Sequence, residues 1–526
     1  MRFFNTAGPV RYKDHYCLPP LERFDLNEVL RLIEQKKYFV LHAPRQTGKT
    51  TCLLALMDFL NGEGKYSCLY VNVELAQAAR ENVGQGMKAI LNEMASWAKH
   101  SLHDPYLESI WLEVLKKSGE FGALVEVLTR WAEINPKPLV LLIDEIDALI
   151  GDTLISVLRQ LRAGYTKRPA LFPQSIVLCG VRDVRDYRIQ SSRDKAIITG
   201  GSAFNIKAES LRLGDFVRSE VERLYTQHTE ETGQLFENDA LDLVWELTHG
   251  QPWLVNSLGY KVCFELEKGR DRSNPITLDM AEQAKENLIL RHETHLDQLV
   301  DKLAEERIRS VIEPILAGAD NPDLIPTDDV WYARDLGLIR TDGGQLQLAN
   351  RIYQEVIPRA LTYTTQLTIS HQLAWYVATN GSLNMDGLLA AFQQFFREHS
   401  ESWLEKFDYK EAGPQLLMQA FLQRIINSDG RVEREYGLGR MRTDLLIIWK
   451  FDDQVQRVVI ELKIVHGSMK TTIEKGIKQT WQYMDRSNAK EGHLLIFDRK
   501  ESKPWQEKIF KIEKDYQGQK ITVWGM

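Results

Sequence analysis

The stretch that decides the fold is His42-Ala43-Pro44-Arg45-Gln46-Thr47-Gly48-Lys49-Thr50-Thr51. An apolar run precedes it at 38–41 and a segment with helical apolar periodicity follows at 52–60, so we expect a strand, a tight loop and a helix. Such a loop holds phosphate oxygens with its backbone N–H groups and with the helix N-terminus. The alternative is a chance octet within a turn, but the flanking strand and helix favour a nucleotide site.

The spacing of this loop matches the pattern Gly-x-x-x-x-Gly-Lys-Ser/Thr except at the first glycine, which is Ala43 here. Alanine fits that position only if its φ is below zero. Lys49 is expected to reach the β- and γ-phosphates of ATP, and the Thr50 hydroxyl is expected to ligate Mg²⁺. The predicted nucleotide-binding residues of the loop are Arg45, Gln46, Thr47, Gly48, Lys49, Thr50 and Thr51.

The composition is that of an ordinary globular protein with several domains: 526 residues, a net charge of −7 and 44% apolar residues. Any contact with nucleic acid must therefore come from a local basic patch. The five cysteines are scattered without a Cys-x-x-Cys spacing, which argues against a disulfide framework and a zinc site. We recognise neither a signal peptide nor a run of about 20 apolar residues, so we expect a cytoplasmic protein without a membrane partner.

A second acidic motif complements the loop. The near-continuous apolar run 139–143 is typical of a strand buried on both faces of a parallel sheet, and it ends in Asp144 and Glu145. We expect this strand beside the loop, with Asp144 holding Mg²⁺ through water and Glu145 polarising the attacking water. The alternative is an acidic strand end that caps the next helix.

Strands and helices alternate in the N-terminal part, which predicts an open α/β sheet with its ligand at the carboxyl ends of the strands. From 206 the pattern becomes helical, and after 291 two helices precede a hairpin, which suggests a winged helix. The predicted division is an arm and α/β core at 1–205, a helical lid at 206–290, a winged-helix-like unit at 291–365, a helical connector at 366–405 and a C-terminal α/β unit at 406–526.

Arginines after the strands could neutralise charge on the γ-phosphate. For any single one, a surface salt bridge explains the residue as well. We choose Arg182 because it directly follows the apolar run 176–180. The other candidates are Arg159, Arg162 and Arg185.

Four motifs together resemble the AAA-like ATPases of the signal-transducing (STAND-type) group: the loop, Asp144-Glu145, the run 180–185, and 250–254 with its Gly-x-Pro. The resemblance covers about residues 15–365. It implies a parallel sheet of the ASCE class, a lid in which Pro252 senses the nucleotide, and a winged helix. It also implies ATP and Mg²⁺ as cofactors, slow cycling between ATP- and ADP-bound forms, and a homo-oligomer.

The C-terminal unit carries a separate constellation. Asp444 leads into an apolar strand, and Glu461 and Lys463 lie on the next one, where their spacing of two puts them on the same face. Two carboxylates that converge beside an ammonium can hold Mg²⁺ for phosphodiester hydrolysis, with Lys463 orienting the nucleophile or offsetting charge on phosphate. The alternative is a solvated edge of alternating charges, although charges on so apolar a strand require a reason.

The pattern Asp-x(n)-Glu-x-Lys resembles the PD-(D/E)XK nucleases of restriction and repair enzymes, with Thr443 in place of the proline. The resemblance implies metal ligands at Asp444 and Glu461, with Mg²⁺ or Mn²⁺ between them. Glu411, at the start of a preceding helix, could supply a further carboxylate; the alternative is a favourable charge at the helix N-terminus. Gln479, with Tyr483 one turn later on a helix, resembles the Gln-x-x-x-Tyr motif beside such active sites.

Basic residues before Asp444 could contact a phosphate backbone, or they could pair with Glu433 and Glu435 nearby. This cluster consists of Arg424, Arg431, Arg434, Arg440 and Arg442, with Tyr436 among them.

The first functional hypothesis is an ATP-controlled, Mg²⁺-dependent nuclease in which DNA is favoured over RNA. By analogy it suggests prokaryotic antiviral defence, with an activating partner or phage-derived trigger. The second is a regulatory ATPase whose C-terminal domain only binds nucleic acid or a partner protein. A DNA-translocating motor ranks last because we find no second RecA-type core.

Overall fold

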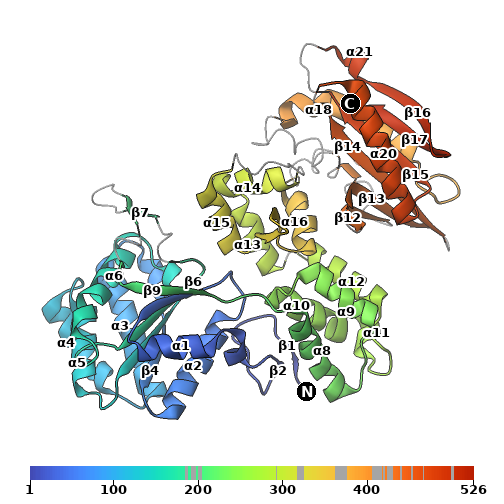
Figure 1. Ribbon diagram of the computed structural model, residues 1–526. Coiled ribbons are helices and arrows are strands. Elements are labelled where there is room, and N and C mark those ends of the chain that lie inside the picture. The colour runs from blue at the N-terminus through green and yellow to red at the C-terminus, as the bar shows by residue number, and fades with distance from the viewer. Residues whose placement is uncertain are drawn as a thin grey trace. The chain divides into compact units, whose positions relative to one another are not determined.

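The computed structural model (Figure 1) describes residues 1–183, 188–190, 197–199, 204–291, 293–316, 325–361, 376–404, 418, 421–422, 430–438, 441–451, 454–465, 467–498 and 503–526. They form two compact units. The first comprises Met1–Arg291 and Tyr332–Ile339, and the second comprises His292–Trp331 and Arg340–Met526. Within these described ranges, no helix is both long enough and apolar enough to cross a bilayer.

The N-terminal arm packs on elements that are far away in sequence. Its strands β1 (Phe3–Phe4) and β2 (His15–Tyr16) pair in parallel, and the short helix η1 (Pro20–Arg23) leads into α1 (Leu26–Glu34). Asp25 caps α1 by accepting a hydrogen bond from the Glu28 amide. The two arm strands were not predicted from the sequence.

A five-stranded parallel sheet forms the core of the first unit, in the order β4-β5-β6-β3-β9. The predicted α/β sheet is therefore confirmed. Strand β5, which ends at Asp144, is separated from β3 by β6. The strands are β3 (Tyr38–His42), β4 (Ser67–Asn72), β5 (Leu139–Asp144), β6 (Ser175–Gly180) and β9 (Lys207–Arg212).

Strand β9 corrects the predicted helical start at 206. Its sequence, KAESLR, lies at the sheet edge and is mostly exposed or half-buried, so it lacks the apolar run that marks the inner strands. Since β9 pairs with β3, the α/β core extends to Arg212.

Both faces of this sheet are covered by helices (Figure 1). Helices α1 and α2 (Lys49–Glu63) pack on one face, where Leu41 and Val140 lie, and α3, α4, α5 and α6 pack on the other, where Val40 and Leu141 lie. This two-sided burial explains the continuous apolar runs of β3 and β5. The other helices are η2 (Glu74–Ala79), α3 (Val83–Ser101), α4 (Tyr106–Ser118), α5 (Ala123–Ile134), η3 (Ile146–Ala148), α6 (Gly151–Gly164) and η4 (Tyr165–Lys167).

The hairpin strands β7 (Arg188–Gln190) and β8 (Ile197–Thr199) follow β6. A helical bundle then completes the first unit, as the sequence predicted. Its first helix begins at Arg218. The bundle consists of α8 (Arg218–Thr232), α9 (Asn238–Thr248), α10 (Pro252–Tyr260), the π-turn Lys261–Glu265, α11 (Glu267–Arg270) and α12 (Leu278–Leu290).

The next segment has three helices, a hairpin and a further helix. The hairpin turns at Gly343 and Gly344, both of which have positive φ. These elements are α13 (Thr294–Lys302), α14 (Glu306–Leu316), α15 (Thr327–Asp335), β10 (Ile339–Asp342), β11 (Gln345–Leu348) and α16 (Arg351–Leu361).

The C-terminal part of the second unit is a six-stranded mixed sheet in the order β12-β13-β14-β15-β17-β16. Strands β12, β13 and β14 are antiparallel neighbours, while β14, β15 and β17 run parallel. The elements are β12 (Gly430–Leu438), β13 (Met441–Phe451), β14 (Gln454–Ile464), α20 (Met469–Ser487), β15 (Glu491–Phe497), α21 (Trp505–Lys508), β16 (Phe510–Tyr516) and β17 (Gln519–Gly525).

Helix α18 (Met385–Leu404) lies in the segment that the sequence predicted as a connector. Leu388, Phe392 and Phe396 pack in one core cluster with residues of β13 and β14. The helix therefore completes the C-terminal sheet on the face opposite α20 rather than linking two bodies. The amphipathic pattern identified the helix, but not the surface that its apolar face would cover.

Candidate functional site

The loop around Lys49 joins β3 to α2, as the sequence predicted. Its left-handed positions are Gln46, with φ of 58°, and Gly48, with φ of 93°. Ala43 is not among the residues with positive φ, so alanine can replace the usual glycine there without backbone strain. The Ala43 amide donates to the Gly180 carbonyl at 3.2 Å, which ties the loop to the end of β6.

Lys49 is buried, and its ammonium donates to the Ala43 carbonyl at 3.0 Å and to the Pro44 carbonyl at 2.9 Å. Thr47 is also buried, with its hydroxyl donating to the Pro44 carbonyl at 2.8 Å. The loop thus folds around its own lysine. Phosphate oxygens are stronger acceptors than amide carbonyls, so they would compete for the same donors.

Two predicted metal ligands, Thr50 and Asp144, are in direct contact at one edge of the sheet. The Thr50 hydroxyl donates to Asp144 Oδ2 at 2.7 Å, and Asp144 is fully buried. Tyr70 of β4, a residue that sequence reasoning missed, donates to the same oxygen at 3.0 Å. Asp144 Oδ1 accepts from the Glu145 amide at 3.0 Å. A hydroxyl and a carboxylate held together at the end of a phosphate-binding loop fit Mg²⁺, which prefers such oxygen ligands.

Glu145 begins the turn after β5 in a left-handed conformation, with φ of 57°. Burial, followed by the charge of Asp147, raises the pKa of this carboxyl above its usual range, although Lys49 acts in the opposite direction. Asp147 accepts a hydrogen bond from the Val181 amide at 3.0 Å and so fixes the turn to the end of β6. A carboxyl with a raised pKa is a stronger base when ionised, which suits the polarisation of water.

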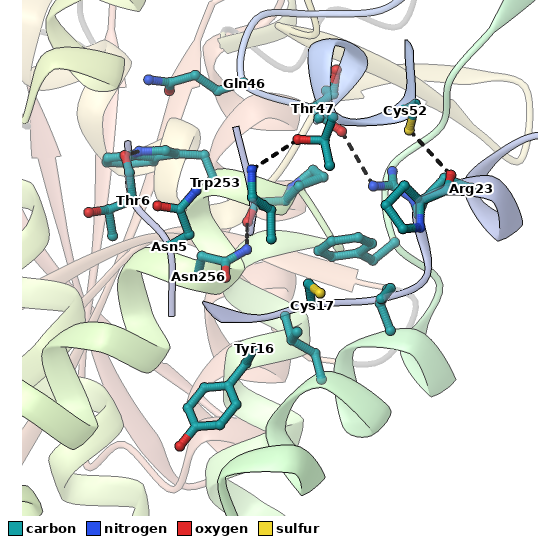
Figure 2. A pocket seen from close by; sticks show the side chains of 18 of the residues that line it. Asn5, Thr6, Tyr16, Cys17, Arg23, Gln46, Thr47, Cys52, Trp253 and Asn256 are labelled. Atoms are coloured by element: carbon teal, nitrogen blue, oxygen red, sulfur yellow. Dashed lines mark hydrogen bonds between the residues drawn. The ribbon is translucent and has the colours of Figure 1, made fainter. Parts of the chain in front are cut away.

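A pocket of about 720 Å³, part of it open to solvent, lies beside the loop (Figure 2). The arm, the loop and the lid each contribute to its wall. Among the lining residues, Arg23 carries the one charged side chain. The predicted residues Gln46, Thr47, Gly48, Thr51 and Pro252 line it, together with Asn5, Thr6, Ala7, Gly8, Val10, Tyr16, Cys17, Leu18, Pro20, Arg23, Cys52, Phe216, Leu224, Trp253 and Asn256.

Hydrogen bonds connect the arm to the loop and to the lid, which form the other walls of this pocket. The Val10 amide donates to the Thr51 hydroxyl at 3.1 Å, and the Trp253 indole donates to the Thr6 carbonyl at 2.9 Å. The irregular, proline-containing arm gave no sequence signal for these contacts. The pocket residues from the arm were therefore missed.

Four predicted nucleotide-binding residues do not line the pocket. The Lys49 ammonium binds carbonyls of the loop, the Thr50 hydroxyl binds Asp144, and Arg45 is exposed. Arg182 does not line the pocket either, and its guanidinium lies 4.7 Å from the ring centre of Tyr332.

The second predicted site lies at β14. The Lys463 ammonium is 2.7 Å from Glu461 Oε1, and Glu461 is only 2% exposed. The paired register of β13 and β14 begins at Leu445 with Ile460, and Asp444 directly precedes Leu445 on β13 just as Glu461 directly follows Ile460 on β14. The side chain of Asp444 and the whole of Glu411 are outside the described residues.

Helix α20 covers the sheet face that carries Glu461. Val459, two residues earlier on β14, packs in one cluster with Ile477 and Tyr483 of this helix. Gln479, which is partly buried, lies between these two residues in the sequence of α20. Within the described ranges, no group of three or more His, Cys, Asp or Glu side chains is placed to hold a metal ion.

Comparison with known proteins identifies the family of the chain. A family model described as an AAA-like domain matches residues 22–358, which is more than half of the chain. The chain belongs to the AAA-like domain family. The parallel sheet and phosphate-binding loop are therefore those of an AAA-like P-loop ATPase domain, whose fold implies a bound nucleotide and Mg²⁺. No curated protein matches the chain.

Solved structures similar to this AAA-like chain include the following three proteins. The Walker-type ATPase PABY2304 of Pyrococcus abyssi is 13% identical, with 67% of this chain and 99% of that chain covered and a TM-score of 0.47. Cdc6p of Pyrobaculum aerophilum is 12% identical, with 66% and 95% covered and a TM-score of 0.36. The Holliday junction branch migration motor RuvB of Thermotoga maritima is 12% identical, with 64% and 96% covered and a TM-score of 0.32.

Proposed function

We propose that this protein is an ATP-driven switch that controls a Mg²⁺-dependent nuclease in its C-terminal domain. The observation that carries the ATPase half is the hydrogen bond between Thr50 and Asp144 beside the buried Lys49. The nuclease half is supported by the Lys463–Glu461 ion pair on β14, which pairs with the strand that contains Asp444.

At the ATPase site, Thr50 and Asp144 would hold Mg²⁺, which supplies charge neutralisation on the phosphates. Lys49 would release the loop carbonyls and bind the phosphates, and Glu145 would orient and polarise water. The apolar and aromatic wall of the pocket, which includes Trp253, suits a flat nucleotide base. Gln46, Thr47, Gly48 and Thr51 would contact the nucleotide from the loop, and Pro252 would contact it from the lid.

At the second site, Asp444 and Glu461 would hold Mg²⁺ or Mn²⁺, with Glu411 as a further ligand, and this metal supplies a nucleophilic hydroxide. Lys463, already fixed beside Glu461, would offset the charge that develops on the phosphate. Gln479 would contact the substrate from α20. We propose that this domain has the PD-(D/E)XK fold, that it includes α18, and that 291–365 is a winged helix.

The charge on α20 supports a polyanionic substrate. This helix starts at the carboxyl end of β14, close in sequence to Lys463, and Lys470, Lys475 and Lys478 are exposed along its first half. Lysines at a helix N-terminal half, where the helix dipole also favours anions, can contact a phosphate backbone. We propose nucleic acid as the substrate, DNA before RNA, in a homo-oligomer that responds to an activating partner or a phage-derived trigger.

The test is incubation of the purified protein with DNA and with RNA, each with and without ATP and Mg²⁺. We expect cleavage that requires Mg²⁺, depends on ATP and is lost in Asp444→Ala and Lys463→Ala. Lys514→Ala, which changes an exposed lysine on β16, serves as the matched control and should cleave normally. Equal digestion of DNA and RNA by both site variants and the parent would refute the nuclease assignment.

One observation favours a second candidate, in which the C-terminal domain only binds nucleic acid or a partner protein. The Glu461 carboxylate is already engaged by Lys463. A crystal soaked in Mn²⁺ distinguishes the two. An ion between Asp444 and Glu461 supports the nuclease, and its absence together with inactivity on both nucleic acids supports the binding domain.

A further inference from the structure

Arg23, at the end of η1, connects three parts of the first unit that are distant in sequence (Figure 2). Its guanidinium donates to the Thr47 carbonyl of the loop at 3.3 Å and to the Gly214 carbonyl at 2.6 Å. The same group lies 4.3 Å from the ring centre of Phe216. Gly214 and Phe216 belong to the segment that leads from β9 into the lid.

The contact continues from Phe216 into the lid. The Phe216 amide donates to the Gly250 carbonyl at 2.8 Å, and Gly250 stands between α9 and α10. A Cβ on Gly250 would lie 1.9 Å from the Phe216 carbonyl oxygen, so the two backbones approach as closely as only glycine permits. The next residue, Gln251, caps α10 by accepting from the Leu254 amide at 2.6 Å.

We propose that Arg23 is a positioning residue that transmits occupancy of the phosphate-binding loop to the lid through Phe216 and Gly250. This inference rests on the proposed nucleotide function of the loop. A nucleotide that reorders the loop moves the Thr47 carbonyl, which is an acceptor for Arg23. Because the same guanidinium is bonded to Gly214 and stacked on Phe216, this movement reaches the entry to the lid.

Arginine suits this role better than lysine. Its planar guanidinium offers several donors in a fixed fork and a flat face that stacks on an aromatic ring. Arg23 uses both properties, since two of its nitrogens bind carbonyls of different segments while the group lies over Phe216. A lysine ammonium can donate hydrogen bonds, but it has no planar face that could stack on Phe216 while it binds both carbonyls.

The experiment measures hydrogen exchange of the full-length protein in the α9 peptide, residues 238–248, with and without ADP. This peptide reports on the lid and contains no residue that lines the pocket. ADP is added at a concentration that saturates each variant, as fixed by separate titration, so occupancy is equal. We expect ADP to slow exchange of this peptide at least about fivefold in the wild-type protein, within the usual range of coupling between sites.

We expect that slowing to disappear in Arg23→Met, in Arg23→Lys and in Phe216→Leu. Arg31→Met is the control, because Arg31 is exposed on α1 and pairs with Glu28, and it should keep the wild-type response. Persistence of the ADP effect in either Arg23→Met or Phe216→Leu overturns the inference while leaving nucleotide binding intact. Failure of wild-type protein to bind ADP in the titration would instead overturn the proposed function and the inference with it.

Discussion

The Thr50 hydroxyl donates a 2.7 Å hydrogen bond to Asp144, although their strands are separated in the sheet by β6. Thr50 follows β3 at the start of α2, and Asp144 ends β5. The contact is possible because the parallel strands end at the same edge of the sheet, where ligands of α/β proteins bind. Two segments 94 residues apart are thereby joined at one candidate Mg²⁺ site.

Replacing Tyr70 by phenylalanine should weaken Mg²⁺ binding. Tyr70 donates to the same Asp144 oxygen as Thr50, so its loss leaves a buried carboxylate with one donor fewer. A hydrogen bond to a charged group contributes about 1.5–3 kcal/mol, so the Mg²⁺ concentration for half-maximal ATP hydrolysis should rise about tenfold or more. The measurement is a Mg²⁺ titration of ATPase rate at fixed ATP.

Tyr38→Phe is the matched control for this titration. Tyr38 is also a buried strand tyrosine, and its hydroxyl donates to the Pro173 carbonyl at 3.0 Å, away from Asp144. Its Mg²⁺ dependence should equal that of the wild-type protein. Identical titrations for both tyrosine variants would show that Tyr70 does not position Asp144.

Lys49→Ala should abolish ATP binding, because the ammonium that would bind the phosphates is removed from a buried position in the loop. The affinity for ATP, measured by calorimetric titration, should fall at least about 100-fold, as expected when a charged contact to phosphate is lost. ATP-dependent assembly and cleavage should be lost with it. Lys65→Ala, which changes an exposed lysine paired with Glu34, should leave all three readouts unchanged. If cleavage and assembly were unchanged in a variant that does not bind ATP, then ATP binding at the loop would not control either of them.

The sequence predicted the parts of the first unit that carry a strong local signal. Strands β3, β5 and β6 are continuous apolar runs because both faces are buried, and the Gly48-Lys49-Thr50 spacing identified the loop. Strand β9 was missed because an exposed edge strand carries charges instead of an apolar run.

Contacts between segments that are distant in sequence could not be predicted, because they produce no local pattern of residue types. The contacts of Arg23 with Thr47 and Phe216 form only because the arm and the lid both fold against the loop. No residue spacing in the sequence predicts these contacts. Tyr70 looked like any aromatic residue of a strand, and its bond to Asp144 depends on the order of the strands in the sheet. The roles of Asp444, Glu461 and Lys463 remain predictions.

Gly250→Ala should destabilise the lid more than Gly233→Ala. Both glycines have φ of 78°, so alanine suffers the same backbone strain at either position, about 1–2 kcal/mol. A Cβ at Gly233 meets nothing within 4 Å, whereas at Gly250 it would lie 1.9 Å from the Phe216 carbonyl oxygen. The difference between the two variants therefore isolates the backbone clash. We expect limited proteolysis to cut the lid faster in Gly250→Ala, and equal cleavage of the two variants would contradict the close packing.

Acidification should loosen β3 through His42. This histidine is buried at the end of β3, and burial lowers its pKa from 6.5 to about 4, with Asp183 opposing and Arg212, Lys207 and Lys49 reinforcing the shift. Because the unfolded chain binds a proton in the range where the folded protein does not, stability is complete above pH 6.5 and declines as the pH falls toward 4.

Between pH 7 and pH 5 this titration should cost about 2 kcal/mol of protection for the β3 amides, beyond the intrinsic change in exchange rate. Hydrogen exchange of the β3 peptide measures it directly, and His42→Gln should remove most of the pH dependence, because glutamine has no proton to gain in this range. His103→Gln, at an exposed histidine, should behave like the wild-type protein. If His42→Gln and His103→Gln showed the same pH dependence, the loosening would have to come from other groups, and the buried imidazole would not control the strand that leads into the phosphate-binding loop.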